Sequence, residues 1–205
     1  MKSSRFHEAI ERFDAINSQD PNQVVCEQSG ELIAKELRDA RAMTAIVESL
    51  YPEAPEAVLL AARSQHIARW KIPRDEYPKG RAGYHNWRNA LKELHAKMTR
   101  NILGQLGYSE EILEQVEKIN LKKGIKRDPE VQMVEDALCL VFLKYHFEDY
   151  IDKWEESKII RILRKTWPKM SELGQVEAAK LDLSDKARAL VCSALSETKL
   201  ATSPN

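Results

Sequence analysis

Two of the five histidines stand where a side chain on a helix faces the protein interior. His66 follows Leu59 and Ala62 by seven and four residues, which is the spacing of one helical face. His95 follows Leu91 by four residues in the same way. An inward imidazole can bind a metal ion or transfer a proton. The alternative is that each histidine is buried, neutral and hydrogen-bonded, with no chemical role.

Two adjacent carboxylates, Glu135 and Asp136, come directly before the most apolar stretch of the chain, residues 137–143. On a helix they lie about 100° apart around the axis, so at least one is expected to point inward. A buried carboxylate needs a cation, a metal or a proton. Together with His66 and His95 the pair predicts a catalytic site with one divalent metal, Zn, Mn or Fe. The alternative is a solvent-facing pair near a helix N-terminus.

The most uneven charge distribution lies between the two histidines. Residues 63–88 contain seven basic and two acidic residues, although the whole chain has 32 of each. Arginine binds phosphate through paired hydrogen bonds, and interleaved aromatic rings can stack a planar ligand. We therefore expect an anionic ligand here; the alternative is a loop held by Arg–acid pairs. The expected substrate-binding residues are Arg63, Gln65, Arg69, Trp70, Arg74, Tyr77, Arg81, Tyr84, Trp87 and Arg88.

The elements that position these residues are predicted to be helices. Apolar residues recur at steps of three or four, and no segment sustains period-two alternation. Gly and Pro are scarce, at 7 and 8 residues. The sequence predicts an all-α fold with over about 60% helix and no sheet. The expected helices cover 4–17, 31–50, 56–70, 84–103, 130–150, 153–164 and 184–195, with a short one after 109.

The length of 205 residues predicts a single all-α domain over 1–195, followed by a flexible C-terminal tail over 196–205. Cys26, Cys139 and Cys192 are far apart, which disfavours a disulfide framework. The longest apolar run has seven residues, against the roughly 20 that span a bilayer. The polar N-terminal stretch does not resemble a signal peptide. We expect a cytoplasmic protein without a membrane partner.

Four blocks of the sequence carry a family resemblance: RFHEAIERFDAINSQDPN, AARSQHIARWKIPRDEYPKGRAGYHNWRNAL, VEDALCLVFLKYHFEDY and RKTWPKMSELG. They closely resemble the domain-of-unknown-function 4202 family. The resemblance covers nearly the whole chain, and QHIARW…IPR…YP…WR is its most specific part. The family name implies no activity.

A weaker resemblance concerns Met43–His66, which is similar to the helix–turn–helix of HD-domain phosphohydrolases. In that family an Ala-Ala-Leu-Leu-His-Asp run ends the helix; here the run is AARSQH, residues 61–66. Val134–Ala137 resembles the late helix that carries the family's metal-binding Asp. The chain has no His-Asp dipeptide, and Arg38–Met43 offers no histidine for the first metal ligand. The resemblance implies an HD-like arrangement of helices with a one-metal site or a metal-free anion pocket.

These observations predict an enzyme, with metal-dependent hydrolysis of a phosphorylated or nucleotide-like substrate as the leading hypothesis. The histidines would hold the metal or act as general base, and Glu135 or Asp136 would ligate the metal or orient a histidine. We expect all four to face one cavity, with at least three of the five arginines at its mouth. Two alternatives remain: a non-catalytic nucleotide- or RNA-binding module that uses residues 63–88, and an adaptor whose 63–88 segment meets an acidic partner.

Overall fold

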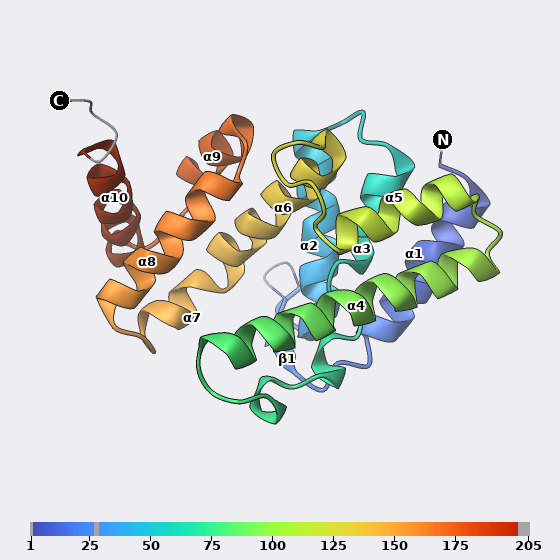
Figure 1. Ribbon diagram of the computed structural model, residues 1–205, viewed down its shortest axis with the longest axis horizontal. Coiled ribbons are helices and arrows are strands. Elements are labelled where there is room, and N and C mark those ends of the chain that lie inside the picture. Colours follow the sequence, from blue (N-terminus) through green and yellow to red (C-terminus); the bar gives the residue numbers. More distant parts are fainter. Residues whose placement is uncertain (1, 27–28, 201–205) are drawn as a thin grey trace. The chain divides into compact units, whose positions relative to one another are not determined.

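The structure is a computed structural model that describes residues 2–26 and 29–200, with side chains described to residue 196. It is 71% helical and 3% strand (Figure 1), which confirms the predicted all-α class. The chain divides into two compact units, Met1–Val134 and Glu135–Asn205, and each is described by itself. Within the described residues, no helix combines the length and apolar composition that crossing a bilayer requires.

The first unit is built around α3, a short helix that is buried on nearly all sides. Helices α1, α2, α4 and α5 all pack against it. A helix that is apolar all round must lie in the core, and residues 57–62 are apolar without interruption. The helices of this unit are α1 (Ser4–Asn17), α2 (Lys35–Leu50), α3 (Glu56–Ser64), α4 (Arg81–Gln105), α5 (Glu110–Asn120) and the start of α6 (Pro129–Tyr145).

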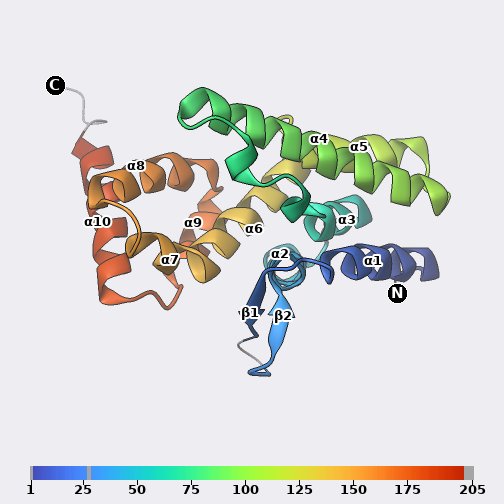
Figure 2. The ribbon, with the colours of Figure 1, turned by 90° about the horizontal axis from the view of Figure 1, so that it is seen from below.

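A two-stranded hairpin interrupts the helical pattern, so the expectation of no sheet is wrong. Strand β1 (Gln23–Val25) pairs antiparallel with β2 (Leu32–Ala34), with Val25 opposite Leu32. The hairpin extends away from α2 (Figure 2). β-Branched residues favour the strands, and helix α2 therefore begins at Lys35 rather than at residue 31.

The segment between α3 and α4 is irregular and contains two 3-10 turns, η1 (Arg69–Lys71) and η2 (Arg74–Glu76). The predicted helix over 56–70 ends at Ser64, and the turn that follows contains the left-handed Ala68, with φ 55°. Helix α4 starts three residues earlier than predicted, after Gly80 at φ 94°. Gly83 lies against the preceding loop so closely that a Cβ there would be 2.0 Å from the carbonyl oxygen of Pro78.

The second unit contains the end of α6 and a group of shorter helices. They are α7 (Phe147–Ile151), α8 (Glu156–Thr166), the 3-10 turn η3 (Trp167–Lys169), α9 (Glu172–Ala179) and α10 (Asp185–Leu200). The predicted helix over 130–150 is broken at His146, and α9 was not predicted. The sequence places the start of the tail at 196, but α10 continues to Leu200; residues 201–205 lie outside the described residues.

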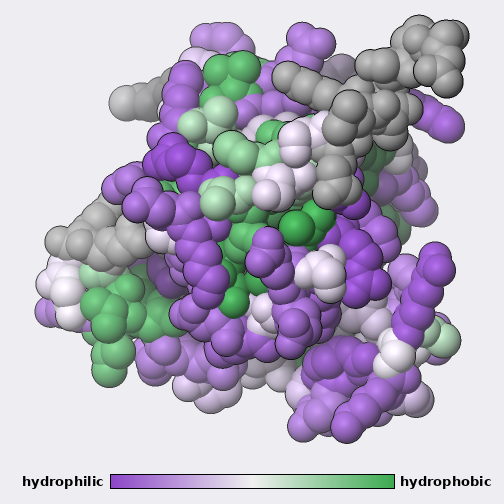
Figure 3. Space-filling model, turned by 90° about the vertical axis from the view of Figure 1, so that its left-hand side faces the viewer, coloured by the Kyte–Doolittle hydropathy of each residue, from purple (hydrophilic) through white to green (hydrophobic). Residues whose placement is uncertain are grey.

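Helices α8 and α10 of the second unit pack against each other. Ile159 and Leu163 on α8 are buried. Figure 3 shows hydrophobic patches between hydrophilic residues on the side of this unit that carries α8 and α10. A groove of about 600 Å³ lies there, with Trp154, Lys158 and Leu190 among its lining residues.

Candidate functional site

His66 and His95 lie side by side in the first unit. Their ring centroids are 5.7 Å apart, and the ring planes meet at 47°. His66 comes from the turn after α3, while His95 stands in the middle of α4. His95 is 2% exposed, whereas the His66 side chain keeps 25% of its surface exposed. The structure thus brings together the two histidines that the sequence singled out, and His66 is the one that reaches solvent.

A hydrogen bond fixes the tautomer of His95. Its Nδ1 is 2.7 Å from the carbonyl oxygen of Ile67, and since a carbonyl only accepts, Nδ1 must carry the proton. Nε2 of a neutral His95 is then an acceptor; it is buried and has no hydrogen-bond partner among the described residues. Burial, aided by the nearby Arg69 charge, lowers the pKa of His95 to about 3. His95 is therefore a neutral ring at physiological pH.

The turn that carries His66 is held in a costly backbone conformation. Ala68 is fully buried and adopts φ 55° and ψ 29°, a left-handed geometry that costs an L-residue about 1–2 kcal/mol. The side-chain Oδ1 of Asn17 accepts a hydrogen bond from the Ala68 backbone nitrogen at 3.2 Å. Strain of this kind persists where surrounding contacts fix the chain, and it is frequent at functional sites.

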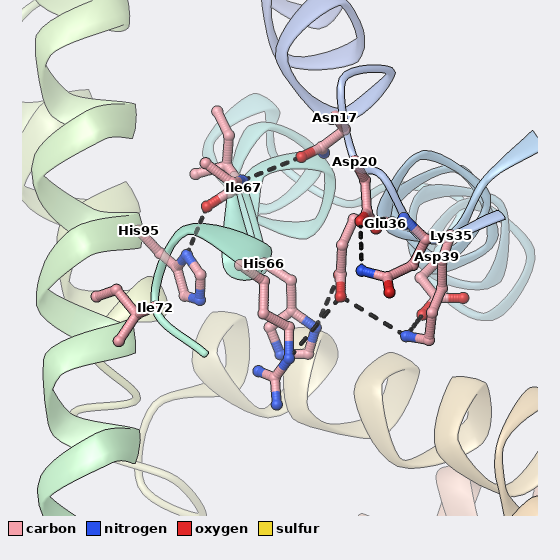
Figure 4. Close-up of polar contacts among 12 residues, drawn as sticks. Asn17, Asp20, Lys35, Glu36, Asp39, His66, Ile67, Ile72 and His95 are labelled. Atoms are coloured by element: carbon pink, nitrogen blue, oxygen red, sulfur yellow. Dashed lines mark hydrogen bonds and ion pairs between the residues drawn. The ribbon is translucent and has the colours of Figure 1, made fainter. Parts of the chain in front are cut away.

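A buried carboxyl, Glu36 at the start of α2, faces the imidazole of His66 (Figure 4). Its Oε2 is 3.9 Å from His66 Nδ1, which is longer than a hydrogen bond. Its Oε1 is 3.8 Å from Arg69 Nε and 3.6 Å from Lys35 Nζ. Glu36 is 4% exposed, so it lies behind the more accessible His66.

The surroundings of Glu36 and His66 shift both pKa values. Burial raises the pKa of Glu36 to about 7, although the charges of Lys35 and Arg69 oppose that rise. Burial, followed by the positive charge of Arg69 and the nearby His95, lowers the pKa of His66 well below its usual value. Near neutral pH, Glu36 can therefore gain or lose a proton, while the imidazole of His66 is neutral and can accept one.

Sequence reasoning missed Glu36, although a signal was present. Ile33, Ala40 and Met43 stand at −3, +4 and +7 from it, so Glu36 occupies the apolar stripe of its own helix. A charged residue inside such a stripe predicts a buried carboxyl.

Two of the five arginines act as structural anchors. Arg63 Nε is 2.9 Å from Asp14 Oδ1 on α1. Arg74 donates from Nη1 to the carbonyl oxygen of Tyr77 at 2.8 Å and from Nη2 to that of Pro78 at 3.0 Å. Arg63 thus joins α3 to α1 through an acid, and Arg74 holds the loop through backbone carbonyl oxygens; their expected role in anion binding stays a prediction.

Of the other three arginines, Arg69 and Arg88 are half-buried and Arg81 is exposed. Arg69 is the one that contacts Glu36. Arg88 Nη1 donates to the hydroxyl of Tyr84 at 3.2 Å, and Arg81 is exposed on the first turn of α4. We call Glu36, His66 and His95 the acid–base cluster. Arg69 is the one of the five arginines that contacts it, through Glu36.

The remaining predicted ligand residues differ in exposure. Gln65 is buried, and its Nε2 is 3.4 Å from the carbonyl oxygen of Asn120, which makes it a core residue. Trp70 is half-buried. The Trp87 indole donates to the carbonyl oxygen of Ile72 at 2.9 Å, which fixes its ring beside the loop.

Glu135 and Asp136 belong to the second unit, and both are buried. Asp136 Oδ1 accepts from the backbone nitrogen of Ser171 at 2.7 Å, and its Oδ2 accepts from the Ser171 hydroxyl. Glu135 Oε1 is 3.9 Å from Lys169 Nζ. Both carboxylates are thus buried, and within this unit Asp136 holds Ser171, the N-cap residue of α9.

The predicted metal ligands are thus divided between the two units: the histidines stand in the first, the carboxylates in the second. Across residues 2–26 and 29–200, no group of three or more His, Cys, Asp or Glu side chains is arranged to hold a metal ion. The divalent metal expected from the sequence stays a prediction.

Comparison with known proteins gives one match. A family model described as Domain of unknown function (DUF4202) matches residues 7–191. Neither the comparison with curated proteins nor that with solved structures returned a match. The resemblance of Met43–His66 to HD-domain phosphohydrolases therefore stays a prediction.

Proposed function

We propose from its site that this chain, which belongs to the DUF4202 family, is a hydrolase acting on a phosphorylated substrate. One observation carries the proposal. The partly exposed imidazole of His66 lies 3.9 Å from the buried carboxyl of Glu36, and the Arg69 guanidinium lies 3.8 Å from the same carboxyl. A proton acceptor and an anion-binding group therefore stand together at the surface of the first unit.

His66 is the residue proposed to take the proton from the attacking water. Its imidazole is neutral, because burial and Arg69 lower its pKa. As the water oxygen bonds to phosphorus and the bond to the leaving oxygen breaks, His66 holds the water proton and then passes it to the leaving oxygen. General acid–base help of this kind accounts for roughly 10²- to 10⁴-fold in rate.

Glu36 acts through His66 and is a positioning residue. An ionised carboxylate beside the ring favours the imidazolium that forms during the reaction. The pKa of Glu36 is raised to about 7, so its carboxyl is ionised in a substantial part of the molecules at neutral pH. Apo geometry is often looser than in the reacting complex, and a small movement from 3.9 Å would form the hydrogen bond.

Arg69 is proposed to bind the phosphate. Its side chain is 31% exposed, and its guanidinium suits paired hydrogen bonds to phosphate oxygens. Arg69 is one of the two charges that lower the pKa of Glu36. If the Arg69 side chain turns from Glu36 toward a bound phosphate, the pKa of Glu36 should rise. Phosphate binding and proton transfer are coupled in this arrangement.

The test is release of inorganic phosphate from p-nitrophenyl phosphate and from ATP, with EDTA and separately with Zn²⁺, Mn²⁺ or Fe²⁺. We expect His66→Asn to lose at least about 100-fold in rate. His7→Asn is the matched control, because His7 is exposed on α1. Activity that needs one of these ions would support the predicted divalent metal.

Two results would contradict the proposal. One is phosphate release at equal rates by the wild type and His66→Asn. The other is a wild type that binds phosphate-bearing ligands but releases no phosphate under any of these conditions. The second result would favour the alternative of a non-catalytic binding module.

A further inference from the structure

The N-terminal half of α4 carries an aromatic shelf, defined as the side chains of Tyr84 and Trp87. Their ring centroids are 5.8 Å apart, with the planes at 46°. Tyr84 is 41% exposed, so one large ring is open to solvent. The indole of Trp87 is held by its hydrogen bond to the carbonyl oxygen of Ile72, which orients the shelf before any ligand arrives.

Three guanidinium groups surround the aromatic shelf. The Cζ of Arg69 lies 5.0 Å from the centroid of the Trp87 ring, and that of Arg74 lies 6.0 Å from it. The Cζ of Arg88 lies 5.9 Å from the centroid of Tyr84. Arg74 is held by carbonyl oxygens, and a carbonyl leaves its positive charge unneutralised. The shelf is a planar apolar surface in a positive field.

Arg69 connects the aromatic shelf with the acid–base cluster. It lies 3.8 Å from Glu36 and 5.0 Å from the Trp87 ring. Trp87 and His95 are eight residues apart on α4, or about 12 Å along the helix axis. A ligand whose phosphate meets Arg69 can therefore lay a planar group on the shelf.

We infer that the aromatic shelf binds the base of a nucleotide whose phosphate is held by Arg69. Every base has a π-face that can stack on an exposed tyrosine, and guanidinium groups add to such stacking. The inference rests on the proposed function and names its substrate class: a mononucleotide rather than a sugar phosphate.

Calorimetric titration of the full chain tests this inference. The probes are AMP, GMP, CMP and UMP, compared with ribose 5-phosphate, which has the phosphate and the sugar but no base. We expect at least one nucleotide to bind ten or more times tighter than ribose 5-phosphate. Tyr84→Leu, which keeps apolar bulk without the planar ring, should weaken that nucleotide by roughly 5- to 150-fold and leave ribose 5-phosphate unchanged.

Tyr84→Phe is the matched control, because it keeps the ring and loses only the hydroxyl; nucleotide affinity should stay within about threefold of wild type. The inference is overturned if no nucleotide binds better than ribose 5-phosphate, or if Tyr84→Leu binds nucleotides as the wild type does. Binding at equilibrium needs no turnover. Absence of phosphate release would therefore reject the hydrolase without touching this result.

Discussion

Asn17 at the end of α1 holds Ala68, 51 residues away, through a buried hydrogen bond to its backbone nitrogen. The bond stabilises the left-handed turn that presents His66 on one side and the carbonyl oxygen of Ile67 to His95 on the other. Asn17 thus helps to position both histidines through the backbone of the turn between them.

Asn17→Ala should destabilise the protein by roughly 1–3 kcal/mol, because the Ala68 N–H would stay buried without an acceptor. Urea unfolding measures the loss. Asn89→Ala on the exposed face of α4 is the control and should change stability by less than about 0.5 kcal/mol. Equal stability of the two variants would mean that the turn does not depend on Asn17.

Glu36→Gln should change how stability depends on pH. The folded-state pKa of about 7 lies above the ordinary 4.5, so the folded protein keeps a proton that the unfolded chain releases. Wild-type stability therefore falls as pH rises from about 4.5 through 7, by up to roughly 3 kcal/mol. Glutamine does not titrate. The free energy of unfolding of the variant should therefore rise relative to that of the wild type as the pH increases from about 4.5 through 7.

Urea unfolding at pH 5 and at pH 8 gives this difference directly. Glu11→Gln, at an exposed position of α1, should follow the wild type at both values. Parallel pH curves for Glu36→Gln and wild type would show that the carboxyl does not carry a raised pKa.

Gly83→Ala and Gly104→Ala form a matched pair on one helix. A Cβ at Gly83 would meet the Pro78 oxygen at 2.0 Å, whereas a Cβ at Gly104 meets no described atom within 4 Å. Gly83→Ala should cost about 1–3 kcal/mol through displacement of the loop. Gly104→Ala should be neutral or stabilising by up to about 1 kcal/mol. Thermal melting distinguishes them, and a neutral Gly83→Ala would contradict the close approach.

Asp136→Ala should destabilise the second unit by roughly 3 kcal/mol, since both oxygens of a buried carboxylate bond Ser171. Ser171 in turn accepts from the backbone nitrogen of Gly174 to begin α9. Asp182→Ala, at an exposed position, is the control. If Asp136→Ala melts like wild type but lowers the metal content of the purified protein, the metal-ligand hypothesis is favoured over the structural role.

The helices could be predicted from sequence because apolar spacing alone determines which residues share a face. The hairpin could not, since its strands have three residues each, too few to show an alternation. The approach of His66 to His95 was expected from inward helical faces, but His66 reaches its position from the turn after α3. The partners of Asp136 could not be predicted. A buried carboxylate requires hydrogen bonds, but the sequence does not show that Ser171, 35 residues away, supplies them. Glu36 was missed because apolar spacing predicts a buried face and does not by itself show that a charged residue shares that face.

Helix α2 begins without a cap of its own: Ala34 offers no side-chain acceptor to the first turn. Asp20 takes that place from the loop before the hairpin, its Oδ2 accepting from the Glu36 backbone nitrogen at 3.0 Å. Its other oxygen accepts from Asn22. The loop over 18–22 thus helps to position Glu36, and with it the carboxyl beside His66. Lengthening that loop by one residue should therefore move the first turn of α2 and change the 3.9 Å separation of Glu36 from His66.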